Sequence, residues 1–524
     1  MVNAKVSTSH VDTAPYHLEG SEENVFISEK EGTTADKRDM ARMGKRQETR
    51  RNFRHPTVIA FTMVILATWE AELATSVYSL GNGGTAGLIW GYLIVMTGFG
   101  FVAASMAEMA SMAPTSGGQY HWVSEFAPPS CQKFLSYLVG WLGMLGWSTA
   151  AATVSYLSAK QIQGLILLNH ASYEPKPWHG TLLIWAILFV CLVFNTFFSK
   201  TLPLVEGIIV ILHVAGFIAV LIVLWVMADR APVDVVFKLF EDNMGWGSTP
   251  LSVMVGLVGA ASCFVGIEAG AHMAEEVRDA AYAIPRAMMW TWIGNGLFGW
   301  LMGITFAFCV KDTMSVLTTP LGVPFMQVFY NSTKSVGGAT GLTCLMLVIS
   351  LFGCVAVIAT ASRQLFVFAR DKGIPFSSFF GQISPTYQIP LNAVYVTVVL
   401  VVLLSLINLG SSVAFMQVVS LGVVAMLTTY IISISCVALK RIRREPLLPS
   451  KFNLGKLGLP TNLISIMFLA FIWVFSLFPS VPRPKVSDMN WAVLGYGSVV
   501  TFSILYFVTR RHSYRGPVEY VRKG

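Results

Sequence analysis

Twelve apolar segments, each long enough to cross a lipid bilayer, follow one another along this 524-residue chain and restrict its fold more than any other feature. In hydrocarbon the backbone must satisfy its own hydrogen bonds, so segments of this length are predicted to be helices. The sequence therefore predicts an all-α polytopic membrane protein. We expect its twelve transmembrane helices at about residues 57–80, 87–112, 135–168, 181–197, 204–227, 251–271, 288–310, 339–362, 391–409, 413–438, 461–478 and 490–508.

Polar segments flank the membrane domain, which we place at residues 55–510. Residues 1–54 lack the apolar core of a secretory signal and are predicted to form a disordered cytoplasmic tail, and residues 511–524 form a second cytoplasmic tail. The loops assigned to the cytoplasm hold thirteen Lys and Arg residues and the outer loops hold seven, as expected for this orientation. The net charge of +8 follows from this topology, so no nucleic-acid partner is expected.

The motifs that mark common enzymes are missing from the sequence. It has no nucleotide-binding loop, GxSxG or HExxH motif, and its seven cysteines are scattered without CxxC or Cys/His metal spacing. We therefore expect no enzyme activity, no metal and no cofactor. One sequon, Asn331-Ser332-Thr333, falls in a loop assigned to the outside, so Asn331 is a predicted glycosylation site.

The sixth apolar segment carries a carboxylate, Glu268, in its second half, together with several glycines. An acidic side chain at that depth is costly in free energy. The glycines indicate an interrupted helix, in which freed backbone groups can bind a ligand. The alternative is that Gly266 and Gly270 form a GxxxG packing motif and that Glu268 is a buried structural partner.

The first apolar segment has two carboxylates, Glu70 and Glu72, in its middle, beside Trp69. On an unbroken helix the two carboxylates would point about 200° apart, so only a local break would let both face one cavity. Trp69 suits a cation-π contact with an amine. A buried structural pair of carboxylates is the alternative. Segments one and six are five spans apart, which favours an inverted repeat with two broken helices.

A group of polar residues follows span six and is a candidate for an inner gate or a proton route. If the helix continues, positions 268, 272, 275, 276 and 279 share one face. A solvated, charged end of a helix is the alternative.

Two further buried positions are candidates for a proton relay. They are Glu108 in span two and His213 in span five, and for each a satisfied structural role is the alternative. Between spans two and three, the amphipathic stretch Gln119 to Phe126 suits a short interfacial helix.

Two stretches resemble the signatures of a known family. EMASMAPTSGGQYHWVSEFAP, between spans two and three, and GIEAGAHMAEEVRDAAYAIPRAM, in and after span six, resemble those of the amino acid, polyamine and organocation (APC) superfamily. LATWEAELATSVYSLGNGGTAGLIWG, with HMAEE and QYHW, is closer still to the fungal amino acid/choline transporter (ACT) family. The likeness covers about residues 50–510 and is not specific to one substrate.

This resemblance implies a five-plus-five inverted repeat with broken helices 1 and 6, two extra C-terminal helices, and alternating access to a central site. Many amino acid permeases receive the substrate carboxylate at a glycine-rich break in span one, where this chain has Trp69-Glu70. An ionised Glu70 would repel an anionic group, which favours choline or another cationic solute. The implied substrate-binding residues are Thr68, Trp69, Glu70 and Ala71, opposite Phe264, Gly266, Ile267 and Glu268.

We therefore expect a secondary active transporter in the plasma membrane, coupled to protons, for a small nitrogenous solute such as choline, another amine, GABA or an amino acid. Trp69 and Glu268 are expected to contact the amine, and Glu70 or Glu72 to carry the proton. Further proton-coupling or gating candidates are Glu72, Glu108, His272, Glu275 and Glu276. The alternatives are a transporter of a specialised amine or alkaloid within a biosynthetic pathway, a non-transporting nutrient sensor and, less favoured, a membrane enzyme.

Overall fold

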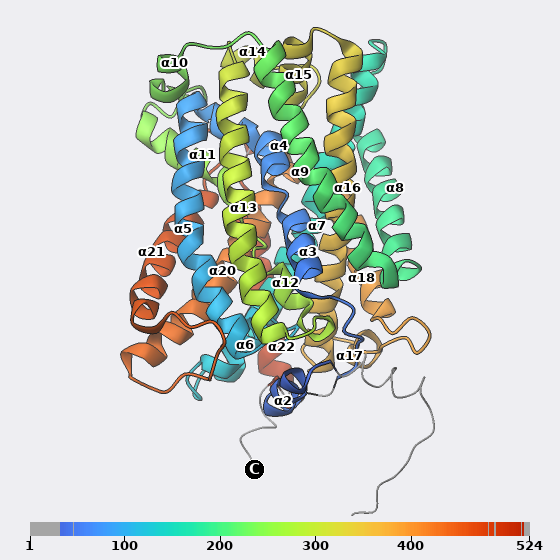
Figure 1. Ribbon diagram of the computed structural model, residues 1–524, viewed down its shortest axis with the longest axis vertical. Helices are drawn as coiled ribbons and strands as arrows, with labels where there is room; N and C mark the ends of the chain where they lie inside the picture. The colour runs from blue at the N-terminus through green and yellow to red at the C-terminus, as the bar shows by residue number, and fades with distance from the viewer. Residues whose placement is uncertain (1–31, 46, 480, 487–488, 515, 518–524) are drawn as a thin grey trace, which may run out of the picture.

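The computed structural model describes residues 32–517, apart from residues 46, 480, 487–488 and 515. The described chain is a bundle of helices that run mostly along one direction (Figure 1). Its described residues contain one small sheet, in which β1 (Asn82–Gly83) pairs antiparallel with β2 (Glu241–Asp242). The prediction of an all-α polytopic membrane protein is confirmed.

The membrane helices form from the predicted apolar segments. In the described chain, ten helical stretches are long and apolar enough to cross a membrane. Helix α7 is also long, at 38 residues, whereas span six is divided between two shorter helices, so the total of twelve spans stays a prediction. These helices are α3 (His55–Leu66), α4 (Thr68–Gly81), α5 (Gly84–Met112), α7 (Gln132–Asn169), α8 (Pro177–Thr196), α9 (Leu202–Met227), α11 (Thr249–Ser262), α12 (Ala269–His272), α13 (Ala280–Cys309), α16 (Val336–Arg370), α18 (Leu391–Ser405), α19 (Ile407–Gly410), α20 (Ser412–Ile442), α21 (Gly458–Ser476) and α22 (Ala492–Arg510).

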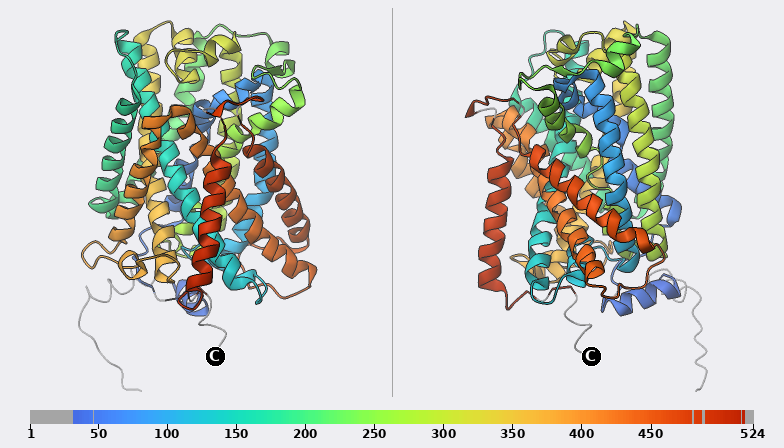
Figure 2. Two further views of the ribbon diagram at one scale, coloured as in Figure 1. Left: turned by 180° about the vertical axis from the view of Figure 1, so that it is seen from behind. Right: turned by 90° about the vertical axis from the view of Figure 1, so that its left-hand side faces the viewer.

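Short helices cover the two ends of the bundle. The α2 end carries α2, α6, α17 and the last described residues, and the α15 end carries α10, α14 and α15 (Figure 1). Helix α22 lies on the outside of the bundle, against α7 and α20 (Figure 2). The short elements are α2 (Thr34–Arg42), α6 (Gln119–Phe126), η1 (Ser199–Thr201), α10 (Val233–Lys238), η2 (Ala274–Glu276), α14 (Thr313–Leu317), α15 (Pro324–Thr333), α17 (Ser377–Phe380) and η3 (Gly455–Leu457).

Spans one and six are both interrupted, as predicted. Helix α3 ends and α4 begins around Ala67, whose backbone is left-handed at φ 38° and ψ 52°. Helix α11 ends at Ser262, and a turn that contains Gly266 at φ 100° leads to α12. Glycine adopts this conformation without a steric penalty, whereas alanine does so at a cost of about 1 kcal/mol. The breaks lie beside the carboxylates that suggested them.

Helix α6 has the predicted bounds but a different environment. All eight of its residues are buried, and it packs against α7 and α20. The indole Nε1 of Trp122 donates to the carbonyl of Ala113 at 3.0 Å. The prediction of an interfacial helix is therefore wrong in this respect: the polar residues of α6 face other helices, because the chain folds back under the bundle at this point.

The N-terminal segment is ordered where the structure describes it. Residues 1–31 of the predicted tail lie outside the described residues, but Thr34–Arg42 forms α2, and a capping box between Thr33 and Asp36 fixes its start. Phe53 forms a parallel bridge with Val277. The expectation of a disordered tail therefore fails for the described part of residues 32–54, because that segment finds hydrogen-bond partners after span six.

Candidate functional site

A cavity of about 120 Å³ lies beside both helix breaks. Spans one and six line it together with α7, α16 and α20, and Trp147 of α7 is its largest side chain. The lining includes no Asp, Glu, Lys or Arg side chain. A larger hollow of about 810 Å³ is lined by residues 477–505 alone, so neither break reaches it. The lining residues of the central cavity are Ile65, Leu66, Ala71, Thr75, Gly146, Trp147, Ala150, Thr153, Val154, Leu157, Ser262, Val265, Val357, Val419, Gly422 and Val423.

The break in span one brings two helix ends to the cavity. Leu66 and Ala71, on either side of Ala67, both line it. The last carbonyl groups of α3 and the first N–H groups of α4 have no partners within their own helices and carry partial charges of opposite sign. These backbone groups give an apolar cavity the means to bind an ammonium group and a carboxylate.

Helix α13 holds this break in place through one residue. The side-chain amide of Asn295 donates to the carbonyl of Met63 at 2.8 Å, and the hydroxyl of Thr68 donates to the carbonyl of Asn295. The side chains of Thr68 and Asn295 are completely buried. The geometry of the break therefore depends on how α13 lies against α3 and α4.

Glu70 points away from the cavity, to a histidine on α9. Its Oε1 lies 2.7 Å from Nδ1 of His213, and Nε2 of His213 lies 3.2 Å from Oδ1 of Asn295. Trp69 packs against the rings of His213 and Phe217, at centroid distances of 6.1 and 6.3 Å. All of these side chains are buried.

The contacts of Asn295 decide which protons this group holds. Because its Nδ2 donates to Met63, its Oδ1 faces His213 as an acceptor, so Nε2 of His213 carries a hydrogen. A second proton is then shared between Nδ1 of His213 and Oε1 of Glu70. Loss of that proton leaves a carboxylate facing a nitrogen lone pair. The pair of Glu70 and His213 therefore links α4 to α9 through one shared hydrogen.

Glu72 faces the other way, toward span six. The thiol of Cys263, at the end of α11, donates to its Oε2 at 3.6 Å, and its Oε1 has no hydrogen-bond partner among the described residues. The two carboxylates of span one thus point to different helices, as the sequence spacing predicts. Glu72 links the two breaks to each other.

The residues predicted from span six lie mostly behind the cavity wall. The hydroxyl of Tyr430 donates to Glu268 at 2.5 Å and accepts from the N–H of Gly266 at 2.9 Å. Phe264 stacks on Phe99 at 5.5 Å, and Ile267 is fully buried. Of the eight predicted substrate-binding residues, only Ala71 lines the cavity in this arrangement.

His272, at the end of α12, contacts a side chain of the cavity wall. The indole Nε1 of Trp147 donates to Nε2 of His272 at 3.1 Å, and Nδ1 of His272 lies 3.0 Å from the carbonyl of Ser116. With an acceptor at Nδ1 and a donor at Nε2, the imidazole is neutral and carries its hydrogen on Nδ1. Trp147, a side chain of the cavity wall, is thus hydrogen-bonded to the last residue of span six.

The charged residues after span six do not share one face, because the helix stops at His272 and continues as the short η2. That expectation is therefore wrong. Glu275 forms a two-pronged ion pair with Arg370 at 3.1 and 3.0 Å, and Glu276 pairs with Nε of Arg363 at 3.0 Å. Burial raises the pKa of Glu275, but Arg370 outweighs this effect and holds the pKa below its usual value.

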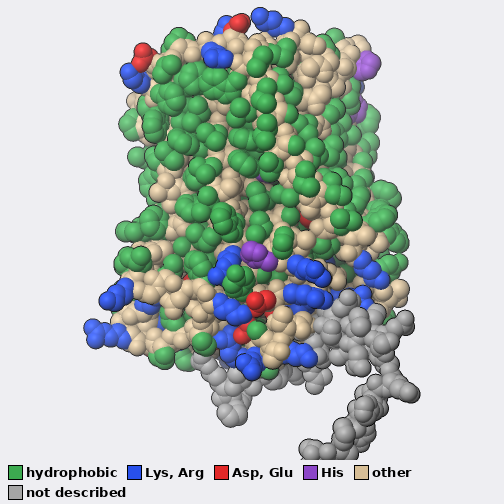
Figure 3. Space-filling model, in the orientation of Figure 1, with side chains coloured by type: hydrophobic (Ala, Val, Ile, Leu, Met, Phe, Trp, Pro, Cys, Tyr) green, Lys and Arg blue, Asp and Glu red, His purple; other side chains and the backbone are tan. Residues whose placement is uncertain are grey.

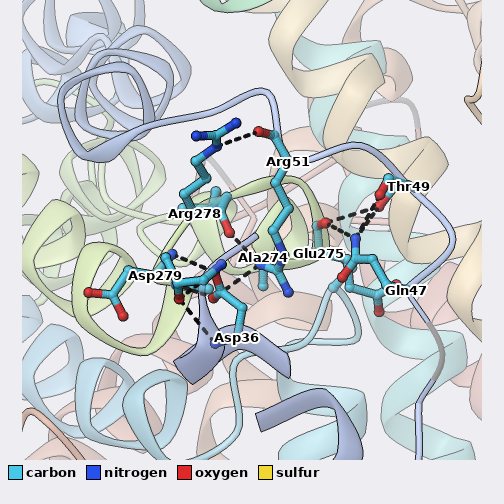
Figure 4. Close-up of polar contacts among 12 residues, drawn as sticks. Asp36, Gln47, Thr49, Arg51, Ala274, Glu275, Arg278 and Asp279 are labelled. Atoms are coloured by element: carbon cyan, nitrogen blue, oxygen red, sulfur yellow. Dashed lines mark hydrogen bonds and ion pairs between the residues drawn. The ribbon is translucent and has the colours of Figure 1, made fainter. Parts of the chain in front are cut away.

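The described part of residues 33–53, called here the N-terminal strap, crosses the connection after span six (Figure 4). Arg51 donates to the carbonyls of Ala274, at 3.1 Å, and Val277, and pairs with Asp36 at 3.3 Å. Asp36 accepts from the N–H groups of Asp279 and Ala280, at 2.9 and 3.1 Å, where α13 begins.

Two more side chains of the strap bind the same connection. Gln47 and Thr49 both donate to the carbonyl of Glu275, at 2.7 and 3.0 Å (Figure 4). Lys45 pairs with Asp371 at 2.9 Å, just after α16. The strap therefore joins the α2 ends of spans six, seven and eight.

Two other predicted residues lie outside this site. Glu108 receives two hydrogen bonds from Arg441, at 2.7 and 2.6 Å, and one from the N–H of Leu454 at 3.0 Å, which ties α5 to α20. This geometry supports the structural role for Glu108. Asn331 is exposed at the α15 end and accepts from Gln327 at 2.8 Å, and its glycosylation stays a prediction.

Several residues of the site had little or no signal in the sequence. Asn295 is a polar side chain within an apolar span, which is a usable signal. Trp147 and Tyr430 look like ordinary residues of apolar helices. The capping box at Thr33 and Asp36 is a sequence signal for a helix start. Its hydrogen-bond partners, more than 200 residues away, cannot be predicted from that signal.

The chain matches known proteins over most of its length. The profile of the family described as amino acid permease matches residues 53–499. The chain is 27% identical over 506 residues to an uncharacterized amino-acid permease of Schizosaccharomyces pombe, covering 95% of this chain and 92% of that protein. It is 27% identical over 474 residues to the choline transporter of Saccharomyces cerevisiae, covering 90% and 82%. It is 26% identical over 478 residues to amino-acid permease 2 of Neurospora crassa, covering 90% and 87%.

Proposed function

Because this chain belongs to the amino acid permease family, we propose that it is a secondary active transporter that moves a small nitrogenous solute across a membrane, coupled to protons. Choline, another amine, GABA and amino acids are the solutes in question. The observation that carries the proposal is a small cavity at two broken helices, both of which place backbone groups beside it.

The substrate binds in this cavity. An ammonium group lies against the carbonyl end of α3 and the face of Trp147, where helix-end charge and the aromatic quadrupole both attract a cation. A carboxylate, where the solute has one, lies at the N-terminus of α4. Because Glu70 is directed toward His213, it does not repel an anionic group here. Amino acids therefore stand beside choline as candidate substrates.

The Glu70 and His213 pair carries the coupling proton. It holds one removable proton, and Asn295 links it to both sides of the break in span one. When the proton leaves, repulsion between the carboxylate and the lone pair of Nδ1 changes the position of α4 against α9. Substrate binding and proton binding thus act on the same break.

The protein lies in the plasma membrane, and its α2 end faces the cytoplasm. Lys and Arg side chains gather at this end of the face seen in Figure 3, which supports the orientation expected from the loops. The strap, His272 and the ion pairs of Glu275 and Glu276 form the inner closure. Their contacts must separate when the cavity opens to the cytoplasm.

Uptake in cells that lack their own permeases tests the proposal. Labelled choline, GABA and lysine are each supplied with and without an imposed proton gradient. We expect gradient-dependent uptake of at least one. Failure of all three, with the protein present at the cell surface, would contradict the proposed function in nutrient uptake and leave export, a specialised amine or the sensor role.

A cavity-filling variant connects uptake to this site. Ala71→Leu places three more carbons in the cavity and is expected to abolish uptake. Ala74→Leu is the matched control, one turn further along α4, because Ala74 lines a separate hollow. Equal loss in both variants would show that the substrate does not depend on the central cavity.

The sensor alternative gains one observation from the structure. The strap connects the N-terminal segment to the closure after span six, so the state of the cavity is coupled to the position of that segment. Deleting residues 1–31, which precede the strap, separates the two functions. Unchanged uptake with lost signalling would support a sensor that also transports.

A further inference from the structure

The inner half of α9 contains a buried carboxylate that the proposed mechanism does not use. Glu206 has no exposed surface, and neither of its carboxyl oxygens has a hydrogen-bond partner among the described residues. A buried polar group without a partner is costly, and a carboxyl group within a membrane helix more so. Such a residue points to a function that involves another state of the protein.

Glu206 lies on the same face of α9 as His213. The two are seven residues apart, which is two helical turns or about 10 Å along the axis. They belong to one buried stripe of α9 that packs against α3, α13 and α16. Since α9 begins at the α2 end, Glu206 lies between the Glu70 and His213 pair and that end (Figure 1).

A second unpartnered group continues the same line. Thr291 of α13 is fully buried, and its hydroxyl has no partner among the described residues. It stands one turn before Asn295, which contacts His213, and α13 also begins at the α2 end. Polar groups therefore lead from the Glu70 and His213 pair toward the α2 end through an otherwise apolar interface.

The titratable residues of the neighbouring helices are engaged with other groups. His55 of α3 lies against the ring of Tyr282, and so does Arg286 of α13, at 5.8 and 3.4 Å. On α16, Arg363 and Arg370 pair with Glu276 and Glu275. The other titratable residues on these helices are Cys309 of α13 and Cys344 and Cys354 of α16.

None of these residues has a hydrogen bond or ion pair with Glu206 in the described structure. No ion-pair partner fixes its charge, so access of water from the α2 end decides whether it is ionised.

We propose that Glu206 is the second proton carrier of the transport cycle, between the Glu70 and His213 pair and the cytoplasm. In the closed state it is a neutral acid. When the α2 end opens, its O–H bond breaks and the proton passes to water. The vacated carboxylate then accepts the shared proton of Glu70 and His213, relayed by water that has entered, and the O–H bond of Glu206 is restored. This inference rests on the proposed function.

The test uses purified full-length protein in liposomes and whichever of labelled choline, GABA or lysine the unaltered protein carries. An imposed difference of one pH unit corresponds to about tenfold accumulation for one coupled proton. Glu206→Gln mimics the neutral acid. We expect it to keep exchange of labelled for unlabelled substrate and to lose accumulation. Glu206→Asp is expected to restore accumulation, and Glu445→Gln, in a partly exposed loop, is the matched control.

A second measurement does not depend on the substrate. A buried neutral carboxylic acid gives an infrared C=O band, and Glu206→Gln is expected to remove one such band from the spectrum of the resting protein. Full accumulation by Glu206→Gln, equal loss of exchange and accumulation, or an unchanged band each overturns the inference. Failure of the unaltered protein to accumulate any of the three solutes would instead contradict proton coupling itself, and the infrared band would still decide the protonation of Glu206.

Discussion

The indole of Trp147, in the wall of the central cavity, donates a hydrogen bond of 3.1 Å to the imidazole of His272, the last residue of span six. The bond crosses 125 residues of sequence and links α7 to α12. Because His272 is also hydrogen-bonded to the carbonyl of Ser116, Trp147 is connected through His272 to the loop before α6. Opening at the α2 end therefore has to break a defined contact.

Trp147→Phe keeps an aromatic wall and removes the donor. A net hydrogen bond contributes about 1 kcal/mol, so the ratio of closed to open molecules is expected to fall about fivefold. Ser262→Cys places a thiol on the cavity wall, and a thiol reagent added from the α2 side should label this cysteine faster when the open state is more populated. Trp141→Phe, on the same helix and outside the cavity, is the control. Equal rates in the two variants would rule out this contact as a gate.

Glu70 and Glu72 are expected to differ in their effect on proton coupling. Glu70→Gln eliminates the exchangeable proton that Glu70 shares with His213, so the rate of uptake should no longer depend on external pH. Glu72→Gln should leave that dependence unchanged, because the partner of Glu72 is a thiol. Initial uptake rates between pH 5 and 8 measure both. The opposite order would move the coupling site to Glu72 and its partner Cys263.

Asp36→Asn tests the strap. The substitution leaves Arg51 buried without its ion-pair partner. This lowers the stability of the closed arrangement by about 3 kcal/mol. We expect faster trypsin cleavage within residues 37–54 of the protein in inside-out vesicles. Asp39→Asn makes the same change of charge three residues further along α2, where Asp39 pairs with the partly exposed Arg42, and should have little effect. Similar cleavage of both variants would mean that Asp36 does not hold the strap.

The ion pair of Glu275 and Arg370 predicts an acid-sensitive closure. The pKa of Glu275 is lower in the folded protein than its ordinary value of 4.5, so its contribution to stability is full above pH 4.5 and is lost as the pH falls through the folded value. We expect the Tm of the purified protein to drop in that range. Glu275→Gln should have a smaller drop, whereas the exposed Asp234→Asn should behave as the unaltered protein. An identical drop in all three would assign the acid sensitivity to other groups.

The breaks were predictable from the sequence because their causes are local. Carboxylates inside apolar runs marked spans one and six, glycines also marked span six, and the structure interrupts the two spans near Ala67 and Gly266. The directions of the side chains were not predictable in the same way. The left-handed residue at position 67 rotates α4 against α3, so Glu70 meets His213 of α9, 143 residues away.

The strap was missed for a related reason. Polar composition favours disorder when a segment has no partners, and the partners of Asp36 and Thr49 are backbone groups more than 220 residues away. Backbone N–H and C=O groups leave no trace in a sequence. Glu206 was visible as a carboxylate in span five, but only the packing of α9 shows that it is buried and unpaired.

Helix α3 joins these features mechanically. It has 12 residues and is therefore about 18 Å long. One of its ends follows Phe53, which is paired with the chain after span six, and the other carries Ile65 and Leu66 to the cavity wall. Ala67 separates it from α4, which packs against α11 and α13. Helix α3 can thus act as a rigid lever that pivots at Ala67. A displacement of the segment before Phe53 would then move Ile65 and Leu66 and change the volume of the cavity.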